Sequence, residues 1–225
     1  MNFYSQCSED KILYEKYISK IELKDPIYLE MGAMSGIEFS NTYFFEKYLN
    51  WTGILIEPHK YNFEQLQINR PNNKLFNNII SNIIGKEVDY INYECECLSG
   101  VAGIVDTIPK DNMLTYYEND NEWQKSMREK YLHIVKLLPI TLTQVIKESK
   151  CEKIDFFSLD VEGYEINVLN GIDFSDVFFH IIVVENHGKW DKDGSLIYDD
   201  FDFLNYFGFY RKHKINQHEF YLNIK

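Results

Sequence analysis

The sequence has few cysteines, which argues against a disulfide framework or a zinc site. Its four cysteines, Cys7, Cys95, Cys97 and Cys151, include one close pair, Cys95 and Cys97. A C-x-C pair lacks the two-residue spacing typical of zinc ligands, and no second pair completes a four-ligand set. We therefore expect four reduced thiols, as in a cytoplasmic protein.

Long apolar runs and an excess of basic residues are also missing. No run approaches the roughly 18 apolar residues that cross a bilayer, and residues 1–6 lack the basic and apolar regions of a signal peptide. The net charge is −12, which opposes binding to nucleic acid phosphates. The one basic run, Arg211 to Lys214, is interpreted as the solvated face of a strand. The sequence thus favours a cytoplasmic protein with neither a membrane span nor a nucleic acid partner.

The hydrophobic content and the length of the chain suffice for one folded core. Hydrophobic residues make up 45% of the 225 residues, a length that suits one α/β domain over residues 1–225. Short apolar strands alternate with helices, a pattern typical of a parallel sheet with crossover helices. Residues 1–25 are expected to form an N-terminal helical segment. Residues 95–138 show no clear pattern and are interpreted as an insertion, or a lid, beside the site.

The periodicity of the apolar residues predicts the following elements. Strands are expected over residues 27–31, 53–57, 75–81, 154–160 and 179–185, with a terminal pair over 208–215 and 219–224. Helices are expected over residues 8–23, 59–69, 123–135, 142–149 and 163–170, with a further helix after Asn41.

Several of the predicted strands end in an acid: Glu30, Glu57, Asp160 and Glu185. In open parallel sheets, ligands bind beyond the carboxyl ends of the strands, and ionised carboxylates accept hydrogen bonds from ribose hydroxyls. Glu57 lies 25 positions after Gly32, close to the offset of about 20 residues at which an acid meets an adenosine ribose. A surface carboxylate before a proline turn is the alternative interpretation of Glu57. The pattern indicates a nucleoside-binding crevice.

The turn after the first predicted strand contains the small residues Gly32, Ala33 and Gly36. Small residues allow the backbone to approach a ligand closely. The third glycine of the G-x-G-x-x-G motif is missing, which argues against a nucleotide-dependent oxidoreductase. That enzyme is kept as one alternative function. A non-catalytic module that binds a cofactor or a glycan is the other.

Seven motifs follow one another over about residues 4–186. They read Ser5-Gln6 with Glu9-Asp10, Glu30-Met31-Gly32-Ala33 with Gly36, Phe39-Ser40-Asn41-Thr42, Trp51-Thr52-Gly53-Ile54-Leu55-Ile56-Glu57-Pro58, Ser99-Gly100, Ile154-Asp155 with Asp160-Val161-Glu162-Gly163, and Val168-Leu169-Asn170-Gly171. The order and spacing of these motifs resemble those of the FkbM family of methyltransferases. One departure is Glu30, which stands where many members of the family carry Asp and which keeps the negative charge.

The resemblance implies a Rossmann-like, class I methyltransferase fold. Such a fold has a mostly parallel seven-stranded sheet, an antiparallel C-terminal strand and helices on both faces. The resemblance also implies S-adenosyl-L-methionine as the methyl donor. The implied acceptor is a hydroxyl group, commonly on a sugar in a glycan, a glycoside or a sugar nucleotide.

The resemblance also assigns residues to the cofactor. Glu30 and the turn from Gly32 to Gly36 would face the methionine part, Glu57 the ribose, and Ser81 and Asn82 the adenine. The full set of expected cofactor-binding residues is Gln6, Glu30, Gly32, Ala33, Gly36, Ser40, Asn41, Glu57, Pro58, Ser81, Asn82, Ser99, Gly100 and Asp160.

Methyl transfer to a hydroxyl needs a group that removes the hydroxyl proton. Asp160, at a strand end, is the favoured base or acceptor-orienting acid. Glu162 is a second candidate and could instead cap the next helix. His187 has a pKa suited to the same role and could equally be an ordinary loop histidine. A Mg²⁺ ion held by Asp160, Glu162 and Glu185 could replace the base, although metal dependence is not the favoured reading.

Overall fold

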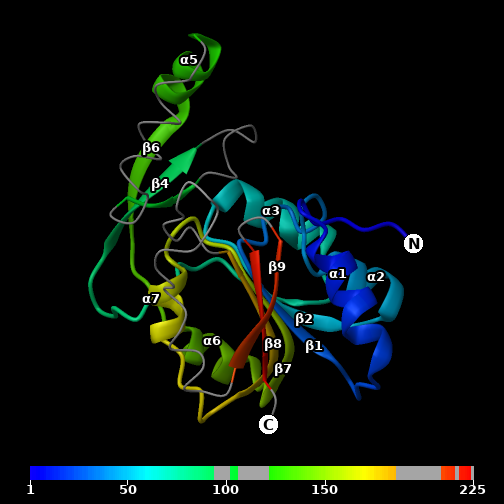
Figure 1. Ribbon diagram of the computed structural model, residues 1–225. Helices are drawn as coiled ribbons and strands as arrows, with labels where there is room; N and C mark the ends of the chain where they lie inside the picture. The colour runs from blue at the N-terminus through cyan, green and yellow to red at the C-terminus, as the bar shows by residue number, and fades with distance from the viewer. Residues whose placement is uncertain (94–101, 106–121, 186–208, 216–217, 224–225) are drawn as a thin grey trace, which may run out of the picture.

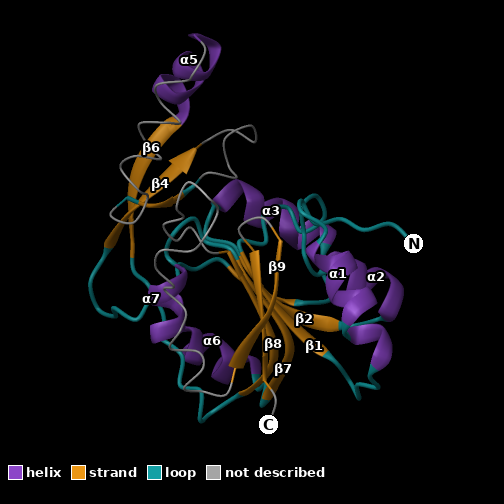
Figure 2. Ribbon diagram, viewed as in Figure 1, coloured by secondary structure: helices purple, strands orange, loops and turns teal. Residues whose placement is uncertain are grey.

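The computed structural model describes residues 1–93, 102–105, 122–185, 209–215 and 218–223. The chain forms one large sheet with helices packed on both faces, and a second, smaller sheet stands beyond one end of it (Figures 1 and 2). The prediction of an α/β protein with a mostly parallel sheet and helices is confirmed.

Within the described residues, the large sheet has seven strands in the order β3-β2-β1-β7-β8-β10-β9. The strands are β1 (Ile27–Met31), β2 (Thr52–Ile56), β3 (Lys74–Phe76), β7 (Lys153–Leu159), β8 (Phe178–Glu185), β9 (Phe209–Ile215) and β10 (His218–Asn223). Strand β10 runs antiparallel to β8 and β9, while the other neighbouring strands pair in parallel. The chain runs outward from β1 to β3 and returns to β7. The strand order therefore reverses between β1 and β7, the position where such sheets bind ligands.

Helices cover both faces of this sheet (Figure 2). One face carries α1 (Glu9–Lys16), α2 (Tyr43–Leu49) and α3 (Lys60–Asn69), and the other carries α6 (Leu142–Ser149) and α7 (Glu165–Asn170). Successive side chains of β1 point to opposite faces: Tyr28 packs with the first group of helices, and Leu29 and Met31 with the second. Burial on both sides explains why the central strands are almost continuously apolar.

The smaller sheet is antiparallel and has the order β5-β4-β6 in the described residues. Its strands are β4 (Val88–Tyr93), β5 (Gly103–Ile104) and β6 (Leu132–Leu137), and α5 (Glu122–Tyr131) leads into β6. The helix predicted over residues 123–135 is therefore too long. The β-branched Ile134 and Val135 pair with Ile91 and Tyr90 of β4, because strand pairing outweighs a helical pattern there.

Two other predicted elements are shorter in the structure. The strand expected over residues 75–81 ends at Phe76, and only Ile80 makes a further bridge, to Ile140. The helix expected over residues 8–23 ends at Lys16 and is followed by a 3₁₀ turn, Ile18–Lys20. Apolar side chains continue beyond each element, at Ile18 in one segment and at Ile79 and Ile80 in the other, and periodicity does not distinguish such buried residues from a longer element.

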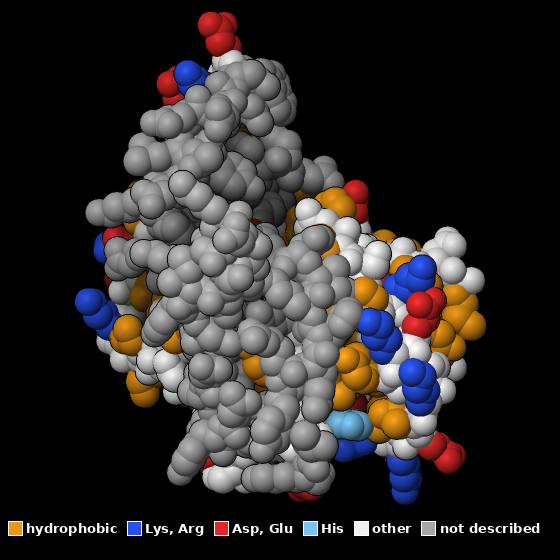
Figure 3. Space-filling model, viewed as in Figure 1, with side chains coloured by type: hydrophobic (Ala, Val, Ile, Leu, Met, Phe, Trp, Pro, Cys, Tyr) orange, Lys and Arg blue, Asp and Glu red, His pale blue; other side chains and the backbone are white. Residues whose placement is uncertain are grey.

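None of the helices in the part of the chain that the structure describes has the length and apolar composition needed to cross a membrane. In the space-filling view, acidic, basic and apolar side chains are interspersed over the described surface beside α1 and α2, at the right of Figure 3.

Candidate functional site

A cavity lies at the carboxyl ends of three neighbouring strands, β2, β1 and β7. Gly32 lines it after β1, Glu57 after β2 and Asp160 after β7. Its volume of about 290 Å³ is near the lower end of the range for small-molecule sites. The small sheet contributes Tyr90 of β4 and Ile104 of β5 to the wall. The cavity thus sits between the reversal point of the large sheet and the small sheet.

Eight of the predicted site residues line this cavity: Gln6, Glu30, Gly32, Asn41, Glu57, Pro58, Asp160 and Glu162. Others lie outside its wall: Ala33, Gly36, Ser40 and Ser81 are inside the protein, and Asn82 is exposed. Ser81 instead shares a hydrogen bond of 2.8 Å with Tyr164, which does line the cavity. Ser99, Gly100 and His187 fall outside the described residues.

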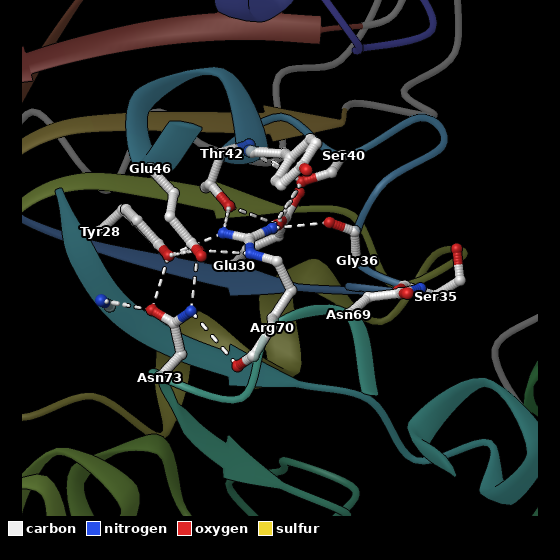
Figure 4. Close-up of polar contacts among 12 residues, drawn as sticks. Tyr28, Glu30, Ser35, Gly36, Ser40, Thr42, Glu46, Asn69, Arg70 and Asn73 are labelled. Atoms are coloured by element: carbon white, nitrogen blue, oxygen red, sulfur yellow. Dashed lines mark hydrogen bonds and ion pairs between the residues drawn. The ribbon is translucent and has the colours of Figure 1, made fainter. Parts of the chain in front are cut away.

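Glu30 is enclosed by the turn that follows its own strand (Figure 4). One carboxylate oxygen accepts the backbone N–H of Asn41 at 2.6 Å, and the other accepts the hydroxyls of Ser40 at 2.9 Å and Thr42 at 2.6 Å. Burial raises the pKa of Glu30, against the charge of Arg70 and these hydrogen bonds, which lower it. Glu30 therefore fixes the segment that leads into α2.

Arg70 is completely buried beside Glu30, a position that no pattern in the sequence predicts. Its guanidinium donates to the Gly36 carbonyl at 2.7 Å and to the Tyr28 hydroxyl at 2.7 Å, and it forms an ion pair with Glu46 (Figure 4). Arg70 thereby joins the turn that contains Gly36 to Glu46 of α2. Gly36 cannot carry a side chain, because its φ is 83° and an added Cβ would lie 2.7 Å from Arg70 Cγ.

Gly32 allows the turn after β1 to approach the end of β7 closely. Its φ is 77°, and an added Cβ would lie 2.1 Å from the carbonyl oxygen of Asp160. No side chain fits at that distance, so glycine is required here for both conformation and space. The turn after β1 and the backbone of Asp160 are consequently in direct contact.

Glu57 is buried but retains capacity for further hydrogen bonds. One carboxylate oxygen accepts the backbone N–H of His59 and the other that of Met34, both at 2.8 Å. Each carboxylate oxygen has two lone pairs, so acceptor sites remain for a ligand. Burial raises the pKa of Glu57 to about 7, although these hydrogen bonds oppose the shift.

His59 joins the large sheet to the small one and was not singled out in the sequence. Its Nδ1 accepts the backbone N–H of Asn62 at 3.4 Å and caps α3, so its Nε2 carries the proton and donates to the Tyr93 carbonyl at 2.6 Å. Burial lowers the pKa of His59, which favours this neutral form. The contact anchors β4, and with it Tyr90, beside the cavity.

The carboxylates near the end of β7 differ from the predicted metal-binding set. Asp160, Glu165 and Glu185 each offer a ligand atom, and the three atoms lie within 4.8 Å of one another. Glu165 therefore takes the position predicted for Glu162, which lines the cavity in a left-handed conformation with φ 56°. Glu165 also accepts the backbone N–H groups of Val161 at 3.0 Å and Gly163 at 3.2 Å. Three carboxylates of this kind suit a divalent cation such as Mg²⁺.

The charges around the cavity are of one sign. Its carboxylates are Glu9, Glu30, Glu57, Asp160 and Glu162, and no Lys, Arg or His is among the described residues of its wall. A wall of this kind favours ligands that carry positive charge or hydrogen-bond donors, and it disfavours phosphates.

The chain matches the model of one protein family. Residues 30–213 match the model of the methyltransferase FkbM domain, a segment that begins within β1 and includes the three strand ends around the cavity. A search of curated proteins gives no match. The family match covers most of the chain and agrees with the motifs at these strand ends. The protein therefore belongs to the FkbM family of methyltransferases.

Proposed function

We propose that the protein transfers a methyl group from S-adenosyl-L-methionine to a hydroxyl group of a sugar-containing acceptor. The observation that carries this proposal is the acidic cavity at the ends of β2, β1 and β7. S-adenosylmethionine has a sulfonium, an ammonium and ribose hydroxyls, all of which suit carboxylate partners. Glu57, at the end of β2, is the proposed acceptor for the ribose hydroxyls.

The same cavity is poorly suited to a dinucleotide. A diphosphate needs backbone N–H groups at a helix N-terminus or basic side chains. In this protein the carboxylate of Glu30 already accepts the N–H of Asn41, two residues before α2 begins. No basic side chain is among the described residues of the wall. These features favour the methyltransferase over the oxidoreductase.

An exposed aromatic residue at the cavity supports a sugar acceptor. Phe39 lines the cavity and is 46% exposed, with a left-handed φ of 62°. A left-handed conformation is costly for a residue with a Cβ and is concentrated at functional sites. A flat apolar ring in this position suits stacking on the apolar face of a sugar.

The proposed chemistry requires the protein to orient a hydroxyl and to remove its proton. When bound, S-adenosylmethionine supplies an activated methyl group. The acceptor oxygen forms a bond to the methyl carbon as the carbon–sulfur bond breaks, and S-adenosylhomocysteine leaves. Asp160, which lines the cavity at the end of β7, is the proposed base that accepts the hydroxyl proton. Glu162, which also lines the cavity, is the proposed partner of a second acceptor hydroxyl.

The experiment is calorimetric titration with S-adenosylhomocysteine and, in parallel, with NAD. We expect micromolar binding of S-adenosylhomocysteine and no binding of NAD. A panel of sugar nucleotides and glycosides is then tested for methylation, with and without Mg²⁺. Binding of NAD alone would overturn the proposal. Binding of S-adenosylhomocysteine without turnover on any acceptor would support a non-catalytic module instead.

A further inference from the structure

A tyrosine of the small sheet presents a hydroxyl to the cavity. Tyr90 lines the cavity and is 3% exposed. Its hydroxyl forms no hydrogen bond with any residue that the structure describes, and it is not fully enclosed, so a ligand can reach it. Tyr164, the other tyrosine of the described wall, differs because its hydroxyl already shares a hydrogen bond with Ser81. The hydroxyl of Tyr90 is therefore available to a ligand.

The strand that carries Tyr90 is held in place by its neighbours. Tyr90 lies in β4, which in the described residues pairs with β5 on one side and β6 on the other. His59 connects β4 to the large sheet, since its backbone N–H donates to Glu57 at 2.8 Å and its ring to the Tyr93 carbonyl at 2.6 Å. The position of Tyr90 relative to Glu57 is therefore fixed before a ligand binds.

The electrostatic surroundings of Tyr90 identify the carboxylates near it. Burial raises the pKa of Tyr90 well above its ordinary value, and the charges of Glu57 and then Glu162 raise it further. The hydroxyl is therefore protonated at neutral pH and can donate a hydrogen bond. Because it does not bond to the carboxylate of Glu57 directly, both groups remain available to one ligand.

A hydroxyl group of a ligand uses two kinds of partner. Its proton needs an acceptor, and its oxygen can accept a hydrogen bond from a donor. The ionised carboxylate of Glu57 supplies acceptors only, and the other charged groups of the described wall are carboxylates as well. Tyr90 supplies the complementary donor. The two side chains together suit a hydroxyl better than a hydrogen atom in the same place, which would leave both of them without a partner.

We propose that the hydroxyl of Tyr90 donates a hydrogen bond to the oxygen of the ribose hydroxyl whose proton Glu57 accepts, and that the pair selects a ribose over a deoxyribose. This inference rests on the proposed function. Tyr90 lies outside the motifs that carry the family resemblance. The small sheet thus adds a contact to the cofactor that those motifs do not supply.

The test compares S-adenosylhomocysteine with its two monodeoxy analogues, each of which lacks one ribose hydroxyl. Calorimetry gives the dissociation constants. We expect the wild-type protein to bind S-adenosylhomocysteine at least about tenfold more tightly than one of the analogues. In Tyr90→Phe, binding of S-adenosylhomocysteine should weaken about 3- to 10-fold, the usual effect of one neutral hydrogen bond. Binding of that analogue should change less than about twofold, since it has no hydroxyl for Tyr90 to contact.

Tyr93→Phe is the matched control. Tyr93 is 4% exposed on the same strand but does not line the cavity, so the loss of its hydroxyl should leave the three dissociation constants within about twofold. Unchanged binding of S-adenosylhomocysteine by Tyr90→Phe, or equal weakening of all three ligands, would overturn the inference and leave the proposed function intact. Equal binding of the three ligands by the wild type would overturn the inference together with the ribose contact of Glu57. Binding of none of them by the wild type would overturn the proposed function as well.

Discussion

Strand β1 and the turn that follows β2 each present a buried glutamate to the same cavity, but the protein uses the two acids differently. Glu30, near the end of β1, is bound by two hydroxyls and one backbone N–H, and Arg70 lies beside it. Glu57, after β2, is bound by two backbone N–H groups and no hydroxyl in the hydrogen bonds described above. The first acid organises a loop and the second retains acceptor capacity. Two strand-end acids of identical type thus take different roles because of their neighbours.

The largest effect should come from breaking the enclosure of Glu30. In Arg70→Met, a buried cation is lost and its acidic partners are left uncompensated, so the free energy of unfolding should fall by about 3–5 kcal/mol. Urea denaturation measures this change. Lys60→Met removes an exposed cation, 84% accessible and 4.0 Å from Glu64, and should change stability by less than about 0.5 kcal/mol. Equal effects would show that Arg70 is not an organising residue.

The next effect concerns the third strand-end acid, Asp160. Asp160→Asn should lower kcat at least about 100-fold, the lower scale for losing a general base, and should leave the affinity for S-adenosylhomocysteine within about threefold. Glu162→Gln is the comparison variant and should raise KM for the acceptor more than it lowers kcat. A larger loss of kcat in Glu162→Gln would transfer the role of base to Glu162.

The smallest effect is a pH dependence that belongs to Glu57. Its pKa is raised to about 7 in the folded protein. Because ribose hydroxyls favour the ionised carboxylate, affinity for S-adenosylhomocysteine should rise about tenfold from pH 6 to pH 8. The free energy of unfolding should change in the opposite direction. Because protonated Glu57 favours folding, its contribution to the free energy of unfolding is complete below the pKa of the unfolded chain and is lost as pH rises through 7. Glu57→Gln should flatten both profiles in calorimetry and urea denaturation, whereas two unchanged slopes would assign them to another group.

The strand ends were predictable because apolar runs that stop at an acid carry a local signal. Glu30, Glu57 and Asp160 each close such a run, and the parallel sheet brings them together. Arg70 carried no such signal: it follows a polar helix end, and only tertiary packing determines that this one cation is buried. The sequence also does not indicate that Glu165, and not Glu162, lies with Asp160 and Glu185 in the group of carboxylates. A left-handed φ at Glu162 redirects the chain, and a non-glycine residue gives little sign of that conformation in the sequence.

The contact between Gly32 and the carbonyl of Asp160 fixes a distance as well as a turn. The contact is between backbone atoms. The distance between the backbone of Gly32, in the turn proposed to hold the methyl donor, and the backbone of Asp160, the proposed base, therefore does not depend on a side-chain rotamer. A change in acceptor size cannot be accommodated by widening this gap. It has to be accommodated elsewhere in the wall, where Phe39 is 46% exposed.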